Sequence, residues 1–235
     1  MKRSLCLLWS VLLVTATSYG QAAASSYGQQ AADLLQKIRA RLDQVNDYQA
    51  MGTMRTNVSF LKEPQAAVTV YFKKPDKLKI KNDKGISLVP KGAVTVSLNN
   101  LLKGSYTVLD GGTDTAHGQK VRVIKLLPQD ENADLVLSTF WVDELRLVIL
   151  RARTTTRDNG TYEVDMRYGK YIAYALPDQV VFTFNVKNYK LPKGITFDYD
   201  DGSKKQQPAA NAKGRVELNY SSYVINKGVP DSAFQ

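Results

Sequence analysis

Polar and apolar residues alternate one by one along most of this chain, and no other feature of the sequence constrains the fold as strongly. Successive side chains of a β-strand point to opposite faces, so a two-residue period predicts strands with one buried and one solvated face. Turn-forming residues separate the alternating segments, which is typical of an antiparallel meander. The predicted strands lie at 54–60, 68–73, 77–81, 94–98, 135–142, 146–153, 162–167, 182–186 and 216–224.

A helix is predicted before the strands, over Ala31–Val45, where apolar residues recur at helical spacing. Pro128–Ala133 predicts a short helical turn. We therefore expect a mainly β fold: a large curved antiparallel sheet that forms an incomplete, half-open β-barrel with a few covering α-helices. One domain is expected over residues 25–235.

The first residues have the layout of a secretory signal peptide. Lys2 and Arg3 precede a short apolar run, and small residues follow, which predicts cleavage after Gly20 or Ala24. The apolar run is shorter than the roughly 20 residues that a membrane-spanning helix needs. The only cysteine, Cys6, lies within this segment, so we expect an exported periplasmic protein with no thiol and no membrane anchor.

Basic residues outnumber acidic ones, and loss of Lys2 and Arg3 lowers the net charge from +10 to +8. An acidic protein or anionic lipid headgroups would suit such a surface, and we expect no nucleic acid for an exported protein. Five lysines from the end of the second predicted strand through the third also have a plainer interpretation, which is to protect an exposed sheet face or edge. These lysines are Lys73, Lys74, Lys77, Lys79 and Lys81.

The excess of strands over helices predicts an apolar hollow. One amphipathic helix cannot cover the whole apolar face of a curved sheet, and the remaining volume is a candidate ligand site. Taken singly, each inward residue is a core residue by default. The candidate lipid-binding residues are Met54, Val58, Val70, Phe72, Leu78, Ile80, Val96, Leu98, Tyr162, Val164, Met166, Phe182, Phe184, Leu218 and Tyr220.

Catalytic and metal-binding signals are weak throughout the sequence. The single histidine, His117, lies in the polar segment Asp114–Gly118 with no metal-ligand spacing, and we interpret it as a solvated turn residue. Asp198, Asp200 and Asp201 lack the spacing of an EF-hand and are interpreted as a hairpin turn. We expect no catalytic residue, no metal and no cofactor.

Five parts of the sequence occur in a distinctive order: the helical Ile38–Val45, then Tyr71–Ile80, Phe140–Asp143 followed by Ile149–Arg151, Leu176–Phe182, and the closing Tyr223–Phe234. In this order they resemble the LolA/LolB superfamily of periplasmic lipoprotein carriers. The resemblance implies an incomplete barrel lidded by helices, whose cavity holds acyl chains of lipoproteins or other lipids without a cofactor or a covalent step. It also implies an inner-membrane lipoprotein-releasing ABC transporter and an outer-membrane acceptor as partners.

One residue role transfers with this resemblance. In the family's carrier, a basic residue that immediately precedes a proline holds the lid closed. Lys74 occupies the position of that basic residue here. Lysine offers a point charge in place of the planar fork of donors of an arginine. The sequence thus favours a monomeric soluble lipid carrier, and the alternative is an envelope sensor or scaffold that binds a protein through its sheet and basic surface.

Overall fold

A computed structural model describes residues 19–57, 65–75, 77–82, 105–158, 160–185 and 213–234 of the chain. One α-helix, two 3-10 turns and a ten-stranded antiparallel sheet make up these ranges. The elements are α1 Tyr19–Leu42, β1 Asp47–Asn57, β2 Gln65–Lys73, β3 Lys77–Asn82, β4 Tyr106–Ala116, β5 Gln119–Pro128, β6 Leu135–Asp143, β7 Val148–Thr156, β8 Gly160–Arg167, η1 Ile172–Tyr174, β9 Gln179–Asn185, β10 Lys213–Ile225 and η2 Asp231–Phe234.

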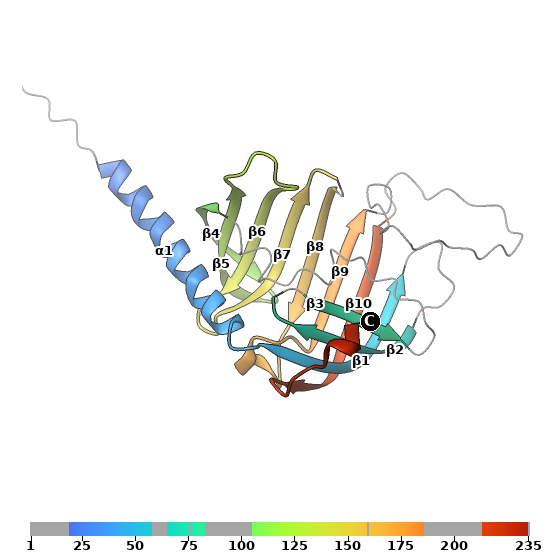
Figure 1. Ribbon diagram of the computed structural model, residues 1–235. Coiled ribbons are helices and arrows are strands. Elements are labelled where there is room, and N and C mark those ends of the chain that lie inside the picture. Colours follow the sequence, from blue (N-terminus) through green and yellow to red (C-terminus); the bar gives the residue numbers. More distant parts are fainter. Residues whose placement is uncertain are drawn as a thin grey trace, which may run out of the picture.

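The sheet is a meander joined through its first and last strands. Its order is β3-β2-β1-β10-β9-β8-β7-β6-β5-β4, so every neighbour follows in sequence except at the antiparallel β1–β10 pair. Figure 1 shows β4–β9 standing side by side as a wall, while β1–β3 and the end of β10 curl round at its foot. The edge strands β3 and β4 do not pair, so the sheet stays open and the predicted half-open, mainly β fold is confirmed.

The helix α1 lies beside β4 at one end of the sheet (Figure 1). It is longer than predicted at its start, because it begins at Tyr19 and so includes the last residues of the predicted signal peptide. It ends earlier than predicted, since tight turn bonds from Gln44 to Arg41 and from Val45 to Leu42 replace the helical pattern after Leu42. From residue 27 onward, where its side chains are described, Ala31 and Ile38 are fully covered and belong to the main core.

A β-bulge shifts the register of β10 against β1. Met51 pairs with Ser222 and Gly52 pairs with Tyr220, so Ser221 is the extra residue. An extra residue reverses the alternation beyond it. Strict alternation predicted Val224 on the inner face and Tyr223 on the outer one; the structure shows the reverse, with Val224 52% exposed and Tyr223 buried.

Two predicted features differ near the middle of the chain. Asp110–Gly112, whose residue types favour a turn, is instead a bulge inside β4, whose register against β5 shifts between Asp110 and Thr113. Pro128–Ala133 closes as a turn, with Ala133 N–H donating to Asp130 C=O at 3.1 Å, and is not helical. The predicted strand at 94–98 and the aspartates at 198–201 lie outside the described residues.

The sheet has a second, smaller core on its outer face. Val148 and Leu150 of β7 point outward to Ala116 and Val121 of the β4–β5 hairpin, while Ile149 between them faces the inner core. A strand covered on both faces carries a continuous apolar run. Within the described ranges, α1 and the two 3-10 turns lack the combination of length and hydropathy that a membrane-spanning helix needs.

Candidate functional site

The strand register places the predicted lipid-binding residues of β8, β9 and β10 opposite one another on the inner face. Phe182 of β9 pairs with Val164 of β8, and Phe184 pairs with Tyr162. Val180 of β9 pairs with Met166 of β8 on one side and with Leu218 of β10 on the other, so these two residues lie on the same face. The rings of Tyr162 and Phe182 lie 5.4 Å apart between centroids, so this part of the face is a continuous apolar surface.

The predicted residues of β1–β3 join the same surface. Val70 pairs with Ile80, Phe72 pairs with Leu78, and Met54 of β1 pairs with Leu218 of β10. Residues from both ends of the sheet belong to one hydrophobic cluster, so the sheet curves enough to bring its inner face around a shared interior. Val58, Val96 and Leu98 lie outside the described residues.

These residues divide into covered and accessible positions. Leu78, Tyr162 and Tyr220 keep part of their surface exposed. The others have 8% exposure or less: Met54, Val70, Phe72, Ile80, Val164, Met166, Phe182, Phe184 and Leu218. The structure therefore brings the described members of the predicted set together, and shows most of them covered by the chain itself.

An aromatic cluster lines the inner face where β1, β2 and β10 meet. Tyr48 stacks on Phe72 with ring centroids 5.2 Å apart, and it meets Tyr223 edge-on at 5.4 Å. Tyr223 also contacts Tyr220 at 5.0 Å and Tyr171 at 4.8 Å. Edge-on and offset ring pairs of this kind are favourable beyond the apolar area that they bury.

Sequence reasoning missed three members of this cluster, Tyr48, Tyr171 and Tyr223. Tyr48, Ala50 and Met54 are separated by even numbers of residues and so point to the same face of β1. Had the predicted strand started before residue 54, the alternation would have placed Tyr48 on the inner face. Tyr223 was placed on the wrong face because the bulge at Ser221 is not visible in the alternation. Tyr171 precedes a 3-10 turn and carries no periodic signal.

Burial raises the pKa of the tyrosines in and near this cluster. Loss of hydration is the main cause for Tyr48, Tyr168, Tyr220 and Tyr223, and Tyr220 is further affected by the neighbouring Tyr48. Tyr223 Oη donates to Pro177 C=O at 2.7 Å and Tyr168 Oη donates to Ile149 C=O at 2.9 Å. All four phenols stay protonated at neutral pH, and those of Tyr168 and Tyr223 act as hydrogen-bond donors.

Lys74 reaches the end of the helix α1. Its Nζ donates to Asp43 C=O at 2.5 Å and forms an ion pair with Asp43 Oδ1 at 3.3 Å. A cation at the C-terminal end of a helix is favourable because the free carbonyls carry partial negative charge. Arg41 holds the same end from the other side, since its Nη2 donates to Ile172 C=O at 3.0 Å and its Nη1 to Arg146 C=O.

Two of the other lysines in this region bind one carboxylate. Lys73 and Lys77 contact Asp231 Oδ1 at 3.0 and 2.9 Å, and the hydrogen bond from Lys77, followed by that from Lys73, lowers the pKa of Asp231. Lys81 Nζ lies 5.5 Å from the centre of the Tyr71 ring. Because β3 is an edge strand, this arrangement suits the edge-protecting interpretation.

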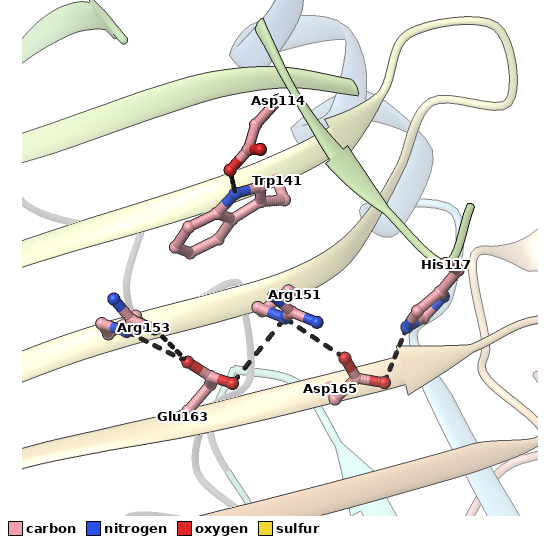
Figure 2. A network of polar contacts seen from close by, with 7 residues as sticks. All are labelled: Asp114, His117, Trp141, Arg151, Arg153, Glu163 and Asp165. Atoms are coloured by element: carbon pink, nitrogen blue, oxygen red, sulfur yellow. Dashed lines mark hydrogen bonds and ion pairs between the residues drawn. The ribbon is translucent and has the colours of Figure 1, made fainter. Parts of the chain in front are cut away.

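His117 lies in a turn, as the sequence predicted, but its side chain is not solvated. Its side chain is 16% exposed, and its Nε2 lies 2.7 Å from Asp165 Oδ1 of β8. Figure 2 shows Asp165 and Glu163 joined through Arg151, while Arg153 binds Glu163 on the far side. The end of the β4–β5 hairpin is thereby attached to the outer face of the sheet.

Trp141 completes this outer network. Its Nε1 donates to Asp114 Oδ2 at 2.8 Å, and the guanidinium groups of Arg151 and Arg153 lie 5.7 and 5.5 Å from its ring centre (Figure 2). This hydrogen bond is the main cause of the lowered pKa of Asp114. The side chains in Figure 2 bind one another, so the network explains how the hairpin is held. In the described part of the chain, no group of three or more His, Cys, Asp and Glu residues is arranged to hold a metal ion.

Solved structures share this fold at low sequence identity. A Vibrio parahaemolyticus domain named for outer-membrane lipoprotein sorting has a TM-score of 0.56 and 12% identity, over 88% of this chain and 97% of its own. A DUF1329 family protein from Desulfovibrio piger has a TM-score of 0.55 and 13% identity over the same shares. A LolA superfamily protein from Nitrosomonas europaea has a TM-score of 0.50 and 11% identity, over 86% of this chain and 97% of its own.

Neither a protein-family model nor a curated protein matches the sequence. The fold that the resemblance implied is nevertheless confirmed, since the structural matches span almost the whole of the compared domains. The chain therefore has a LolA-like fold.

Proposed function

We propose that this chain is a soluble periplasmic carrier that binds acyl chains of lipoproteins or other lipids on the inner face of its sheet. The observation that carries the proposal is the single apolar cluster that extends over the inner face from β1–β3 to β5–β9. The lipoprotein-sorting name of the Vibrio parahaemolyticus domain, which has the same fold, supports it.

Binding of this kind needs no polar recognition of the chain itself. Each buried methylene contributes roughly 0.8 kcal/mol, so even ten methylenes would contribute about 8 kcal/mol before the costs of ordering the chain. Release then requires an acceptor that binds the same chain more tightly. We propose an inner-membrane lipoprotein-releasing ABC transporter as donor and an outer-membrane protein as acceptor, after cleavage of the signal peptide at residue 20 or 24.

Most inner residues are covered by the chain, so the proposed mechanism includes a step in which the protein opens to admit the ligand. Phe182 and Val164 are 2% exposed, so a ligand contacts them only after the chain moves away. We propose that α1 is the part that moves and that Lys74 is its latch, because Lys74 binds the carbonyl and the carboxylate of Asp43 at the end of the helix. Arg41 would be a second latch of the same kind.

The test is extraction of the purified exported protein with organic solvent, followed by mass spectrometry. We expect acyl lipid in a stoichiometric amount, and a reduced amount from the Leu78→Gln variant, which places an amide on a partly exposed position of the inner face. Lys81→Gln is the matched control, because Lys81 lies in the same strand and lies over Tyr71 on the outer face.

A clean extract would contradict the carrier, provided that a synthetic triacylated lipopeptide also fails to bind. The alternative function, an envelope sensor or scaffold that binds a protein through the sheet and the basic surface, would then be favoured. The lysines along the edge strand β3 are the feature that suits it. Salt-sensitive binding of an acidic partner protein to the lipid-free chain would support that alternative.

A further inference from the structure

The outer face of β1, β2, β3 and the end of β10 carries side chains that the proposed lipid-binding inner face does not explain. The register aligns them in two adjacent rows that run from β3 to β10: Lys79, Tyr71, Gln49 and Val224, and beside them Lys81, Thr69, Met51 and Ser222. Cations therefore lie along the edge strand β3, and apolar side chains lie on β1 and β10. We use the name outer patch for Lys77, Lys79, Lys81, Tyr71, Met51 and Val224.

Met51 and Val224 are exposed apolar side chains on neighbouring strands. Each of them is 52% exposed. Val224 pairs with Gln49, two residues before Met51, so the two apolar side chains are diagonal neighbours on one face. Tyr71 pairs with Gln49 from the other side and also keeps part of its surface exposed. Single exposed apolar residues are ordinary, but neighbours on one face form a small apolar surface, and here lysines line one side of it.

Positive charge exceeds negative charge over these strands. Lys77, Lys79 and Lys81 point to the same face of β3, because alternate residues of a strand do so. Asp231 binds Lys77 together with Lys73. In β1, β2 and β3 as the structure describes them, five residues are basic and Asp47 is the one carboxylate, so the two carboxylates Asp47 and Asp231 leave an excess of cations.

Protection of the free edge accounts for only part of this arrangement. Lysines on an edge strand prevent it from pairing with a strand of another sheet, and β3 is such a strand. Met51 and Val224, in contrast, lie on β1 and β10, each of which has a neighbouring strand on both sides. Edge protection does not require apolar side chains to be exposed there.

We infer that the outer patch docks on a bilayer surface that contains anionic phospholipids. The lysines bind the phosphate groups, while Met51, Val224 and the ring of Tyr71 enter the boundary between headgroups and acyl chains. Such a surface offers negative charge and apolar material within a few ångströms of each other, as the patch requires. A second copy of this chain suits the patch less well, because it would bring the same excess of positive charge to the contact.

The place of the patch gives docking a use for a carrier, although docking itself does not depend on a lipid in the interior. Leu78 follows Lys77 in β3, points to the inner face and is partly exposed. A bilayer held by the lysines thus lies beside the edge over which a lipid would reach Leu78. Docking changes the rate of lipid exchange and not the amount held at equilibrium, so a variant that fails to dock should still contain lipid after purification.

The test is flotation of the purified exported protein with vesicles of phosphatidylglycerol and phosphatidylcholine in equal amounts, and with vesicles of phosphatidylcholine alone. We expect tighter binding to the mixed vesicles, and loss of this preference at about 1 M salt, where the screening length falls to roughly 3 Å. Each lysine near an anionic surface contributes about fivefold in affinity, so Lys79→Gln/Lys81→Gln should weaken binding to the mixed vesicles about 25-fold. Lys120→Gln/Lys125→Gln is the matched control, since it removes equal charge from exposed positions of β5.

The apolar part of the patch has a test of its own. Met51→Ser/Val224→Ser should weaken binding to the mixed vesicles about tenfold and leave the salt dependence unchanged, because it removes apolar area that enters the bilayer. Leu109→Ser is its control: Leu109 is an exposed leucine of β4, at the opposite edge of the sheet, and its loss should have no effect.

Equal binding of the wild type to both kinds of vesicle would overturn the inference, and so would an equal loss in the two lysine variants, which would show an effect of net charge alone. Binding of poly-L-glutamate in place of the vesicles, with loss of that binding in Lys79→Gln/Lys81→Gln, would also overturn it and assign the face to an acidic protein. Vesicle binding by a protein whose organic extract is clean would contradict the carrier function and leave the docking surface intact.

Discussion

Alkaline unfolding offers a quantitative test of how the inner tyrosines are packed. Burial raises the pKa of Tyr48, Tyr168, Tyr220 and Tyr223, whereas each phenol titrates near pH 10 in the unfolded chain. Above pH 10 the folded state holds more protons than the unfolded state, so stability is complete below pH 10 and decreases as the pH rises. One fully protonated phenol lowers the free energy of unfolding by about 1.4 kcal/mol at pH 11.

Four such phenols together remove about 6 kcal/mol at pH 11, if their effects add. That is comparable with the whole stability of many domains, roughly 5–15 kcal/mol. We therefore expect cooperative unfolding close to pH 11. Tyr48→Phe/Tyr220→Phe deletes two of these phenols and no hydrogen bond to a described residue, so it should match the wild type at pH 7 and be more stable by about 3 kcal/mol at pH 11.

The assay is urea unfolding followed by circular dichroism from pH 7 to pH 11, with phenolate absorbance recorded in parallel. The chain has 13 tyrosines. Tyr48, Tyr168, Tyr220 and Tyr223 should ionise only in the step in which the ellipticity is lost. If these four phenols ionised near pH 10 while the circular dichroism stayed native, the packing of the aromatic cluster would be wrong.

Three further substitutions test other contacts. Lys74→Leu should speed lipid release about two- to fivefold in a transfer assay, because a partly exposed ion pair contributes up to about 1 kcal/mol. The control Lys73→Leu removes a contact to Asp231 instead and should not change the release rate. Equal release rates for the two variants would exclude a latch role for Lys74. Thr154→Val should lower the free energy of unfolding in urea by about 1–3 kcal/mol, because the buried Ser138 hydroxyl, 3.0 Å from the Thr154 hydroxyl, loses its partner. An unchanged urea midpoint would show that a water molecule takes the place of the Thr154 hydroxyl. Gly52→Ala should lower the free energy of unfolding by about 3 kcal/mol or more, measured by thermal unfolding, because the new Cβ would lie 2.2 Å from the Asn219 carbonyl oxygen in the adjacent strand. A near-neutral result would show that the bulge can relax.

The sequence predicted most of the inner face because those strands alternate without interruption. Phe182, Phe184 and Val164 are found where a two-residue period places them. The same rule failed at Tyr223, because one extra residue in β10 reverses the period and a bulge leaves no mark in the pattern of polar and apolar residues.

The strands β4 and β5 escaped prediction for a related reason. A bulge interrupts β4 at Gly111 and Gly112, and polar residues follow it because they bind the outer face of the sheet. The position of His117 depends on Asp165, which lies 48 residues further along the chain. A contact between positions so far apart depends on the tertiary fold, and the pattern of a single sequence does not reveal it.

The two ends of the inner face differ in how tightly they are held, and this difference bears on where a ligand enters. Near β6 and β7 the sheet is covered on both faces: Val148 and Leu150 lie under the hairpin, and Ile149 lies in the inner core. A segment packed on both sides opens only at a high free energy. At the other end, Leu78, Tyr48 and Tyr220 keep exposed surface while the neighbouring Phe72 is covered. For the proposed carrier, an acyl chain that enters over β1–β3 and β10 would displace the fewest native contacts on its way toward Phe182. The difference in packing between the two ends of the sheet would then decide the route of entry.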